Sequence, residues 1–242
     1  MAKTIAPKSA PETQPALSKH EDFILKYKNT LIGGVVALIV IVAGIIFWNK
    51  HKASQLNEAQ FAMQAPELQV QLGMTELQQA AGLFGEKEFE MALNGDSTGT
   101  TKGLLKIADE YSSTKAGNLA NLYAGLCYAH MDKWEEAVKY LEKYDAVGDI
   151  LISPAALGAL GNAYAHVNQL DKAVSTLTKA AEKADNIMLS PMYYIQAGEI
   201  LESQGKKADA LKLYKKVKGM ESYTQSSPYV DMIDEYIERA TE

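Results

Sequence analysis

Hydrophobic and polar residues follow two different patterns along this chain, one unbroken and one periodic. The unbroken pattern runs from Leu31 to Trp48, where 18 consecutive residues carry no charge and are mostly Leu, Ile, Val, Ala and Gly. With its uncharged flanks at Asn29 and Asn49, a helix over this run would be about 30 Å long, enough to cross a bilayer. We therefore predict a transmembrane helix over residues 29–49.

Two other structures could account for the apolar run. A buried core helix would be expected to show a polar face over about five turns, and this run shows none. A cleaved signal peptide would have a shorter apolar run, nearer the N-terminus, and would end at a small-residue cleavage site, whereas here Asn49 and Lys50 follow Trp48. The pattern favours an uncleaved signal anchor.

The lysines around the run predict its orientation. Two follow it closely, Lys50 and Lys52, whereas five precede it. Because basic residues are retained on the cytoplasmic side, residues 1–28 are expected in the cytoplasm and the chain after residue 49 outside it. Residues 1–28 start with a stretch rich in Pro, Ala, Ser, Thr and Lys that lacks aromatic residues, which predicts a disordered tail.

The periodic pattern occupies the C-terminal half, where Pro154, Pro191 and Pro228 lie 37 residues apart and each follows a serine. Proline is tolerated in the first turn of a helix and serine is a good N-cap, so each pair predicts a helix start. Such a period is typical of stacked helical hairpins. We predict an all-α fold whose main part is a helical solenoid. Small residues recur at nearly the same interval, at Gly125, Gly161, Gly198, Ala137, Ala173 and Ala210.

The repeat divides the chain beyond the predicted membrane helix into three parts. Residues 50–113 are a helical lead with a polar loop, in which Pro66 starts or kinks a second helix. Residues 114–227 hold the repeats, and residues 228–242 form a capping helix with an acidic exposed face. Helix pairs are predicted at 115–130 with 134–146, 154–167 with 170–184, and 191–204 with 206–218.

The turns within these pairs carry an independent signal. Equivalent positions there hold Asp132, Asn168 and Gly205. These residue types are the ones that best tolerate positive φ. We expect all three to adopt a left-handed backbone conformation.

Composition narrows the function. The chain carries 24 basic and 30 acidic residues, a net charge of −6, and Arg239 is its only arginine. Such a chain is unsuited to nucleic acid or to arginine clamps for phosphates. Cys127, the only cysteine, cannot form an intramolecular disulfide, and its apolar neighbours predict a buried, inert thiol. The sequence contains no catalytic motif or phosphate loop, so we expect no enzymatic activity, cofactor or small-molecule substrate.

The repeat resembles the tetratricopeptide repeat, in which a small residue and an aromatic on the first helix meet Ala and a large residue on the second. It departs from the family in its longer period and in Asn121, Leu157 and Tyr194, which stand where the family has Trp. The copies hold Gly125, Tyr128, Ala137 and Leu141; then Leu160, Gly161, Tyr164, Ala173, Leu177 and Ala180; then Gly198, Ala210 and Tyr214.

The whole layout is similar to that of the YfgM-like family, the ancillary subunits of the bacterial SecYEG translocon. Residues 104–144 carry the resemblance, with the sequence LLKIADEYSSTKAGNLANLYAGLCYAHMDKWEEAVKYLEKY. It implies a single-pass protein of the bacterial inner membrane with a periplasmic C-terminal domain, whose partners are the translocon and periplasmic chaperones or clients. An adaptor subunit of another envelope assembly, for secretion or cytochrome maturation, would have the same layout.

The first helices of such an array line its concave face, which is the candidate partner-binding surface. It is expected to be apolar at one end and acidic at the other, without Lys or Arg, and so to suit an extended or helical apolar segment. Several of its leucines could instead pack against the preceding helix. The candidate residues are Leu119, Leu122, Leu126, His130, Asn162, His166, Met192, Ile195, Glu199 and Glu202.

Two of these candidates admit another chemistry. His130 and His166 occupy equivalent positions in successive repeats and could share a metal ion, as a metal-dependent enzyme would require. The next equivalent position holds Ser203, and no third ligand is apparent. We therefore expect ordinary surface histidines and no metal.

Overall fold

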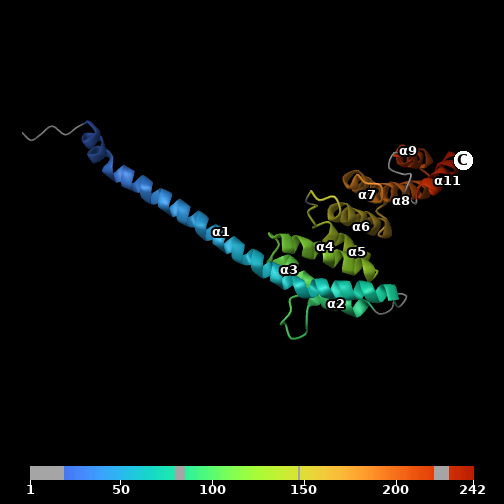
Figure 1. The fold of residues 1–242 in the computed structure, drawn as a ribbon, viewed down its shortest axis with the longest axis horizontal. Helices are drawn as coiled ribbons and strands as arrows, with labels where there is room; N and C mark the ends of the chain where they lie inside the picture. The colour runs from blue at the N-terminus through green and yellow to red at the C-terminus, as the bar shows by residue number, and fades with distance from the viewer. Residues whose placement is uncertain (1–18, 80–84, 147, 221–228) are drawn as a thin grey trace, which may run out of the picture. The chain divides into compact units, whose positions relative to one another are not determined.

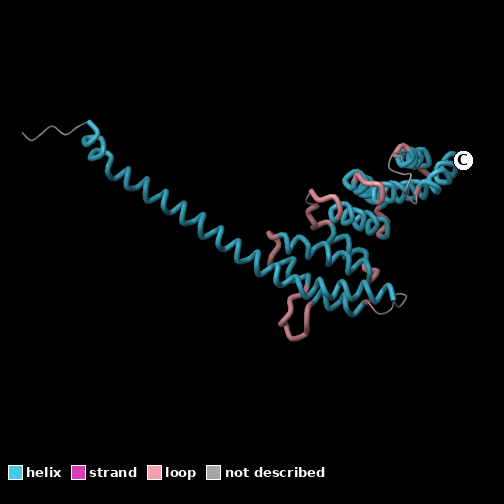
Figure 2. Tube along the Cα trace, in the orientation of Figure 1, coloured by secondary structure: helices cyan, strands magenta, loops and turns pink. Residues whose placement is uncertain are grey.

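The computed structural model describes the backbone of residues 19–79, 85–146, 148–220 and 229–242, and their side chains except at 19–39, 73–79, 230 and 231. The described chain is helical apart from loops and one isolated antiparallel bridge between Gly95 and Lys102 (Figures 1 and 2). It divides into two compact units, Met1–Ala53 and Ser54–Glu242. The prediction of an all-α helical solenoid is confirmed.

The first unit contains the N-terminal part of α1 (Lys19–Gln79). This helix begins inside the segment 1–28, which was predicted as a disordered tail, and residues 1–18 lie outside the described residues. Over the part of the chain that the structure describes, no helix combines the length and apolar character that crossing a membrane requires. Of the predicted span, residues 29–39 lie outside the residues whose side chains are described.

The second unit begins with residues 54–79 of α1, which run through Pro66 without interruption. No second helix starts at Pro66, contrary to that part of the prediction. The Pro66 side chain is fully buried, and this packing offsets the backbone hydrogen bond that a proline removes. α2 (Glu86–Asn94) and α3 (Leu104–Glu110) complete the lead. The lead shares one hydrophobic cluster with α4 through Ala59, Met63, Phe89, Leu104, Ile107 and Ala120.

Three helix hairpins follow and stack in chain order (Figure 1). The final helix, α11 (Val230–Thr241), packs against the second helix of the last hairpin. The predicted pairs are confirmed, with the second helix of the first pair ending earlier than residue 146. The pairs are α4 (Lys115–His130) with α5 (Trp134–Leu141), α6 (Ile152–His166) with α7 (Leu170–Ala184), and α8 (Leu189–Ser203) with α9 (Lys207–Lys218).

The repeated glycines lie where the two helices of a hairpin approach most closely. A Cβ atom at Gly125 would lie 2.5 Å from Leu141 Cγ, and one at Gly161 would lie 2.6 Å from Leu177 Cγ. Any larger residue would therefore push the paired helix away. Each hairpin needs a glycine at this contact, which explains why glycine recurs at the repeat interval in the sequence.

The turns within the hairpins adopt the predicted left-handed conformation. The φ angles of Asp132, Asn168 and Gly205 are 55°, 58° and 73°. In each turn the N–H of the next residue donates to the carbonyl five residues earlier, at distances of 2.9, 2.8 and 2.9 Å. This is the Schellman pattern, which satisfies carbonyl groups at the end of the first helix.

The helix starts at the Ser-Pro pairs differ from the prediction. α6 and α8 begin one residue before Ser153 and Ser190, and neither serine caps its helix. Instead, Asp149 Oδ1 accepts hydrogen bonds from the N–H groups two and four residues later, at 3.0 Å each. Asn186 Oδ1 accepts from those two and three residues later, at 3.0 and 2.8 Å. The third pair, Ser227-Pro228, lies outside the described residues.

Cys127 lies in the cluster that joins α4 to the helical lead, and its side chain is fully buried. Burial raises the pKa of its thiol to about 12, because a thiolate would lose its hydration there. The predicted burial of this cysteine is confirmed, and its low reactivity stays a prediction.

Candidate functional site

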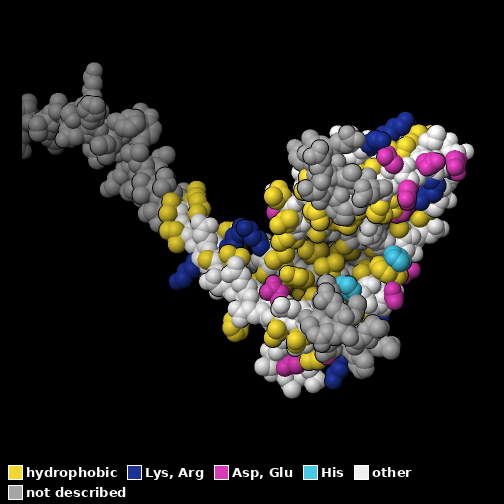
Figure 3. Space-filling model, turned by 45° about the vertical axis from the view of Figure 1, so that its right-hand side comes forward, with side chains coloured by type: hydrophobic (Ala, Val, Ile, Leu, Met, Phe, Trp, Pro, Cys, Tyr) yellow, Lys and Arg dark blue, Asp and Glu magenta, His cyan; other side chains and the backbone are white. Residues whose placement is uncertain are grey.

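Side chains of α5, α6 and α8 enclose an open groove of about 470 Å³, which we name the α6–α8 groove. Figure 3 shows a hollowed face of the second unit on which hydrophobic side chains gather and histidines lie. Because α6 and α8 are first helices of successive repeats, the groove belongs to the surface predicted to bind a partner. It is lined by Trp134, Asn162, Ala165, His166, Gln196, Glu199, Ile200 and Ser203.

One wall of the groove is a stacked pair of rings. Trp134 begins α5 and His166 ends α6, and their ring centroids lie 3.6 Å apart with planes 3° from parallel. The stack therefore joins two successive repeats. A fixed pair of rings offers a flat apolar surface with polar edges, a combination common at protein interfaces.

The rest of the lining alternates amide and apolar groups. Asn162 on α6 and Gln196 on α8 carry amides, and Ala165 and Ile200 lie beside them. Gln196 Oε1 is buried and has no hydrogen-bond partner among the described residues. Because an amide both donates and accepts, such side chains can pair with the main chain of a bound segment.

The structure separates eight of the predicted surface residues into three groups. Asn162, His166 and Glu199 meet in the α6–α8 groove. Leu122 and Ile195, each 5% exposed, lie in the core instead and cannot contact a partner, which corrects their assignment to the surface. The reason is helical periodicity, because a first helix also turns side chains toward its neighbours. Partly buried positions are taken by Leu119, Leu126 and Met192.

The two equivalent histidines contact different aromatic rings. His130 stacks on Phe89 of α2 with ring centroids 5.3 Å apart, whereas His166 stacks on Trp134. Burial lowers the pKa of the His130 imidazole, because the charged form loses solvation beside the lead. Within the described residues there is no group of three or more His, Cys, Asp or Glu side chains that could hold a metal ion.

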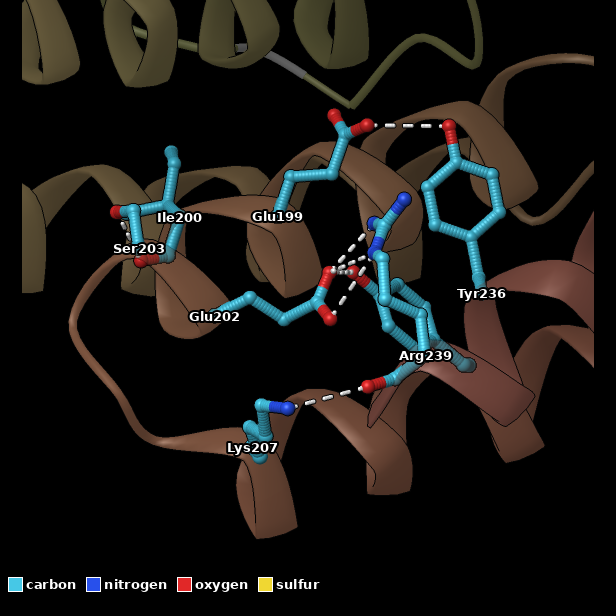
Figure 4. A network of polar contacts seen from close by, with 8 residues as sticks. Glu199, Ile200, Glu202, Ser203, Lys207, Tyr236 and Arg239 are labelled. Carbon is cyan, nitrogen blue, oxygen red and sulfur yellow. Dashed lines mark hydrogen bonds and ion pairs between the residues drawn. The ribbon is translucent and has the colours of Figure 1, made fainter. Parts of the chain in front are cut away.

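Side chains of α11 contact the acidic end of the predicted surface (Figure 4). Glu202 accepts hydrogen bonds from Arg239 Nε at 3.2 Å and from the Tyr214 hydroxyl at 2.7 Å. Glu199 accepts one from the Tyr236 hydroxyl at 3.0 Å. The hydrogen bond from Arg239 lowers the pKa of the Glu202 carboxyl. The predicted residues of this surface include no arginine, and Arg239 of α11, which was not among them, pairs with Glu202 at its acidic end.

Sequence reasoning missed the two α11 residues in this cluster, although a signal for them exists. Tyr236 follows Glu199 by 37 residues, and Arg239 follows Glu202 by 37. These intervals equal the spacing of the Ser-Pro pairs, so α11 is a further copy of the first helix. Equivalent positions of neighbouring first helices lie side by side. Two residues that are one repeat period apart in the sequence can therefore be expected to contact each other.

Comparison with known families agrees with the stacked hairpins. Residues 21–218 match the model of the tetratricopeptide repeat-like domain. The chain belongs to this family. In this tetratricopeptide repeat-like protein the match includes the helical lead as well as the three hairpins, and it ends before α11.

One solved repeat structure shows the same fold at low sequence identity, and a second aligns more weakly. The tetratricopeptide repeat-like chain has a TM-score of 0.53 and 14% identity with the TPR-like repeats of a putative kinesin light chain from Podosopora anserina. That alignment covers 72% of this chain and 84% of the other. The MamA protein aligns with a TM-score of 0.44 and 15% identity, over 73% of this chain and 86% of that one. No curated protein sequence gives a significant match.

Proposed function

We propose that this protein is a non-enzymatic interaction scaffold, anchored in the bacterial inner membrane, whose repeats bind the Sec translocon and periplasmic chaperones. Membership of the tetratricopeptide repeat-like family supports a role in protein binding, because stacked hairpins offer an extended binding surface. The resemblance of residues 104–144 to the YfgM-like family supports the choice of partners. The observation that carries the proposal is that one chain has both an open groove, the α6–α8 groove, and an exposed apolar stretch of helix in α1.

The exposed apolar helix supports the anchor. In the first unit Val40, Ile46, Phe47 and Trp48 are 64%, 61%, 73% and 69% exposed. Large apolar side chains clustered on one stretch of helix are unfavourable in water and favourable in a bilayer. Taken with the uncharged run 29–49, they favour insertion of this helix, with the second unit in the periplasm.

The α6–α8 groove supports protein binding more than catalysis. Its lining combines a stacked ring pair with two amide side chains, which suits an extended or helical segment. Anchoring would raise the local concentration of the groove near a membrane partner, so weak contacts would suffice.

In-cell photocrosslinking tests the proposal. A photoreactive residue replaces Asn162 or Ser203 in the groove, and, as the matched control, exposed Glu136 on α5. Translocon subunits or periplasmic chaperones captured from the groove but not from position 136 are the expected result. Reproducible capture of the subunits of another envelope assembly would instead indicate that the protein is an adaptor of that assembly. Equal capture from all three positions would show that the groove is not a binding surface.

A separate measurement tests the anchor. Membranes from cells that produce the chain are washed with alkaline carbonate, and the distribution of the protein is followed by immunoblot. The intact chain should stay in the membrane pellet. A variant with Ile41→Lys, Ile45→Lys and Trp48→Lys should be released, because charged side chains are costly at the centre of a bilayer. Release of the intact chain would contradict the anchor.

A further inference from the structure

A second hollow, of about 740 Å³, lies beside the loops that connect successive repeats. One wall comes from the start of α4 and the turn before it, and the other from the connection between α5 and α6. We name it the loop-edge pocket. Apart from Leu119, it contains none of the residues predicted to bind a partner. It is lined by Ser112, Ser113, Thr114, Lys115, Asn118, Leu119, Asn121, Lys143, Tyr144, Asp145, Gly148, Asp149 and Ile152.

Hydrogen bonds between side chains and backbone hold the two walls of this pocket in place. Asn118 Nδ2 donates to the Asp145 carbonyl at 2.9 Å, and the Asp145 N–H donates to Asn118 Oδ1 at 2.7 Å. Asp149 caps α6, and its Oδ2 also accepts from the Ser153 hydroxyl at 2.6 Å. The pocket is therefore formed before any ligand binds, which lowers the entropic cost of binding.

The charges of the lining favour an anionic group. Lys115 and Lys143 are exposed on the two walls, and the lining also has an exposed carboxylate, Asp145, on the same wall as Lys143. The carboxylate of Asp149 is already compensated by the N–H groups at the start of α6. The N-terminus of the 16-residue helix α4, capped by Thr114, adds a partial positive charge.

A buried polar group in the lining still lacks a partner. Asn121 is 8% exposed, and its Nδ2 donates to the Gly117 carbonyl at 3.1 Å. Its Oδ1 has no hydrogen-bond partner among the described residues. Such a group is costly to leave unpaired. Because the oxygen has almost no accessible surface, a bound segment cannot pair with it unless the Asn121 side chain moves.

Apolar side chains continue the pocket along the loop. Ile150, Leu151 and Ile152 are 70%, 64% and 49% exposed. One period later, Met188 stands at the position equivalent to Leu151 and is 53% exposed. Exposed apolar side chains of this size gathered next to a formed pocket are typical of a binding surface.

We propose that the loop-edge pocket binds an extended segment of a partner protein in which apolar side chains neighbour an acidic one. The acidic side chain lies between Lys115 and Lys143 near the start of α4. The apolar side chains pack on Leu119 and on the Ile150–Ile152 run. This site is separate from the α6–α8 groove and does not depend on the partners proposed for that groove.

Peptide binding to the full chain in mild detergent tests this inference. The probes are fluorescent decapeptides, acetylated and amidated at their ends, with Leu, Val or Phe around a central Asp, and matched peptides with Asn in its place. Fluorescence anisotropy should show that the Asp peptides bind at least tenfold more tightly, and that added salt reduces the difference. Equal affinity of the two sets, or no binding of any peptide up to about 1 mM, would overturn the proposal.

Two pairs of variants locate the binding. Lys115→Gln with Lys143→Gln should weaken the Asp peptides about tenfold and leave the Asn peptides unchanged, whereas Lys133→Gln with Lys179→Gln, two exposed lysines elsewhere, should change neither. Ile150→Ser with Leu151→Ser should weaken both sets, and exposed Met91→Ser should not. Self-association of the chain that the Ile150 and Leu151 changes abolish would assign the surface to a second copy and overturn the proposal.

Discussion

Arg239 and Glu202 occupy equivalent positions, one period apart, in two neighbouring first helices, and they form an ion pair across the end of the array. Arg239 Nε lies 3.2 Å from both carboxylate oxygens of Glu202. The Glu202 side chain is 13% exposed and the Arg239 side chain 53% exposed, so water screens this pair in part, from the arginine side. The only arginine of the chain thus links α11 to α8.

Removing this contact is expected to destabilise the C-terminal end. Arg239→Gln leaves Glu202 without its cationic partner and should lower the free energy of unfolding by about 1–3 kcal/mol. The measurement is urea unfolding followed by circular dichroism. Glu238→Gln, an exposed change on the same helix, is the control and should have little effect. Equal effects of the two changes would show that the ion pair does not fix α11.

The same contact predicts a dependence on pH. The hydrogen bond from Arg239 lowers the pKa of Glu202 in the folded chain. A lowered carboxyl pKa contributes stability above the pKa of the unfolded chain, and this stability is lost as the pH falls through the folded pKa. The difference in unfolding free energy between the natural chain and Glu202→Gln should therefore be full at pH 7 and shrink below about pH 4. A difference that stays constant from pH 7 to pH 3 would exclude an ionic contribution.

The close contact between α6 and α7 gives a third prediction. Gly161→Ala places a methyl group 2.6 Å from Leu177 Cγ and 3.2 Å from the Leu177 backbone nitrogen. The clash should outweigh the helix-forming advantage of alanine and cost about 1–2 kcal/mol net. Gly148→Ala is the control, because its Cβ would meet nothing within 4 Å. Thermal unfolding of both variants tests this, and a Gly161 variant as stable as the control would contradict it.

Sequence alone predicts the parts of this fold that depend on local chemistry. Asp132, Asn168 and Gly205 identify the turns, because few residue types tolerate positive φ. The repeated glycines identify the hairpin contacts for a similar reason. Each of these features depends on the local backbone or on a contact within one hairpin, and it recurs in every copy of the repeat.

The errors arise where tertiary contacts compete with local preference. Pro66 favours a helix start, but its buried side chain holds it inside α1. Ser153 has the chemistry of a cap, but Asp149 accepts the same N–H groups and also binds the serine hydroxyl. The repeat pattern indicates which helices form the candidate surface. It does not distinguish the exposed side chains of these helices from buried ones such as Leu122.

Cys127 offers a direct measurement of local stability. Burial raises the pKa of its thiol to about 12, so at pH 8 the folded chain holds almost no thiolate and hides the sulfur from reagents. Alkylation by iodoacetamide should therefore occur only when the region around α4 opens.

As a reference for an accessible thiol, Ser175→Cys combined with Cys127→Ala should react at the rate of a free cysteine. Because only the open form reacts, and opening and closing are expected to be fast relative to alkylation, raising the urea concentration should accelerate labelling of Cys127 in proportion to the open population. The rate of the reference thiol should stay nearly unchanged. Rapid labelling of Cys127 in the native chain would show that this core is open to solvent.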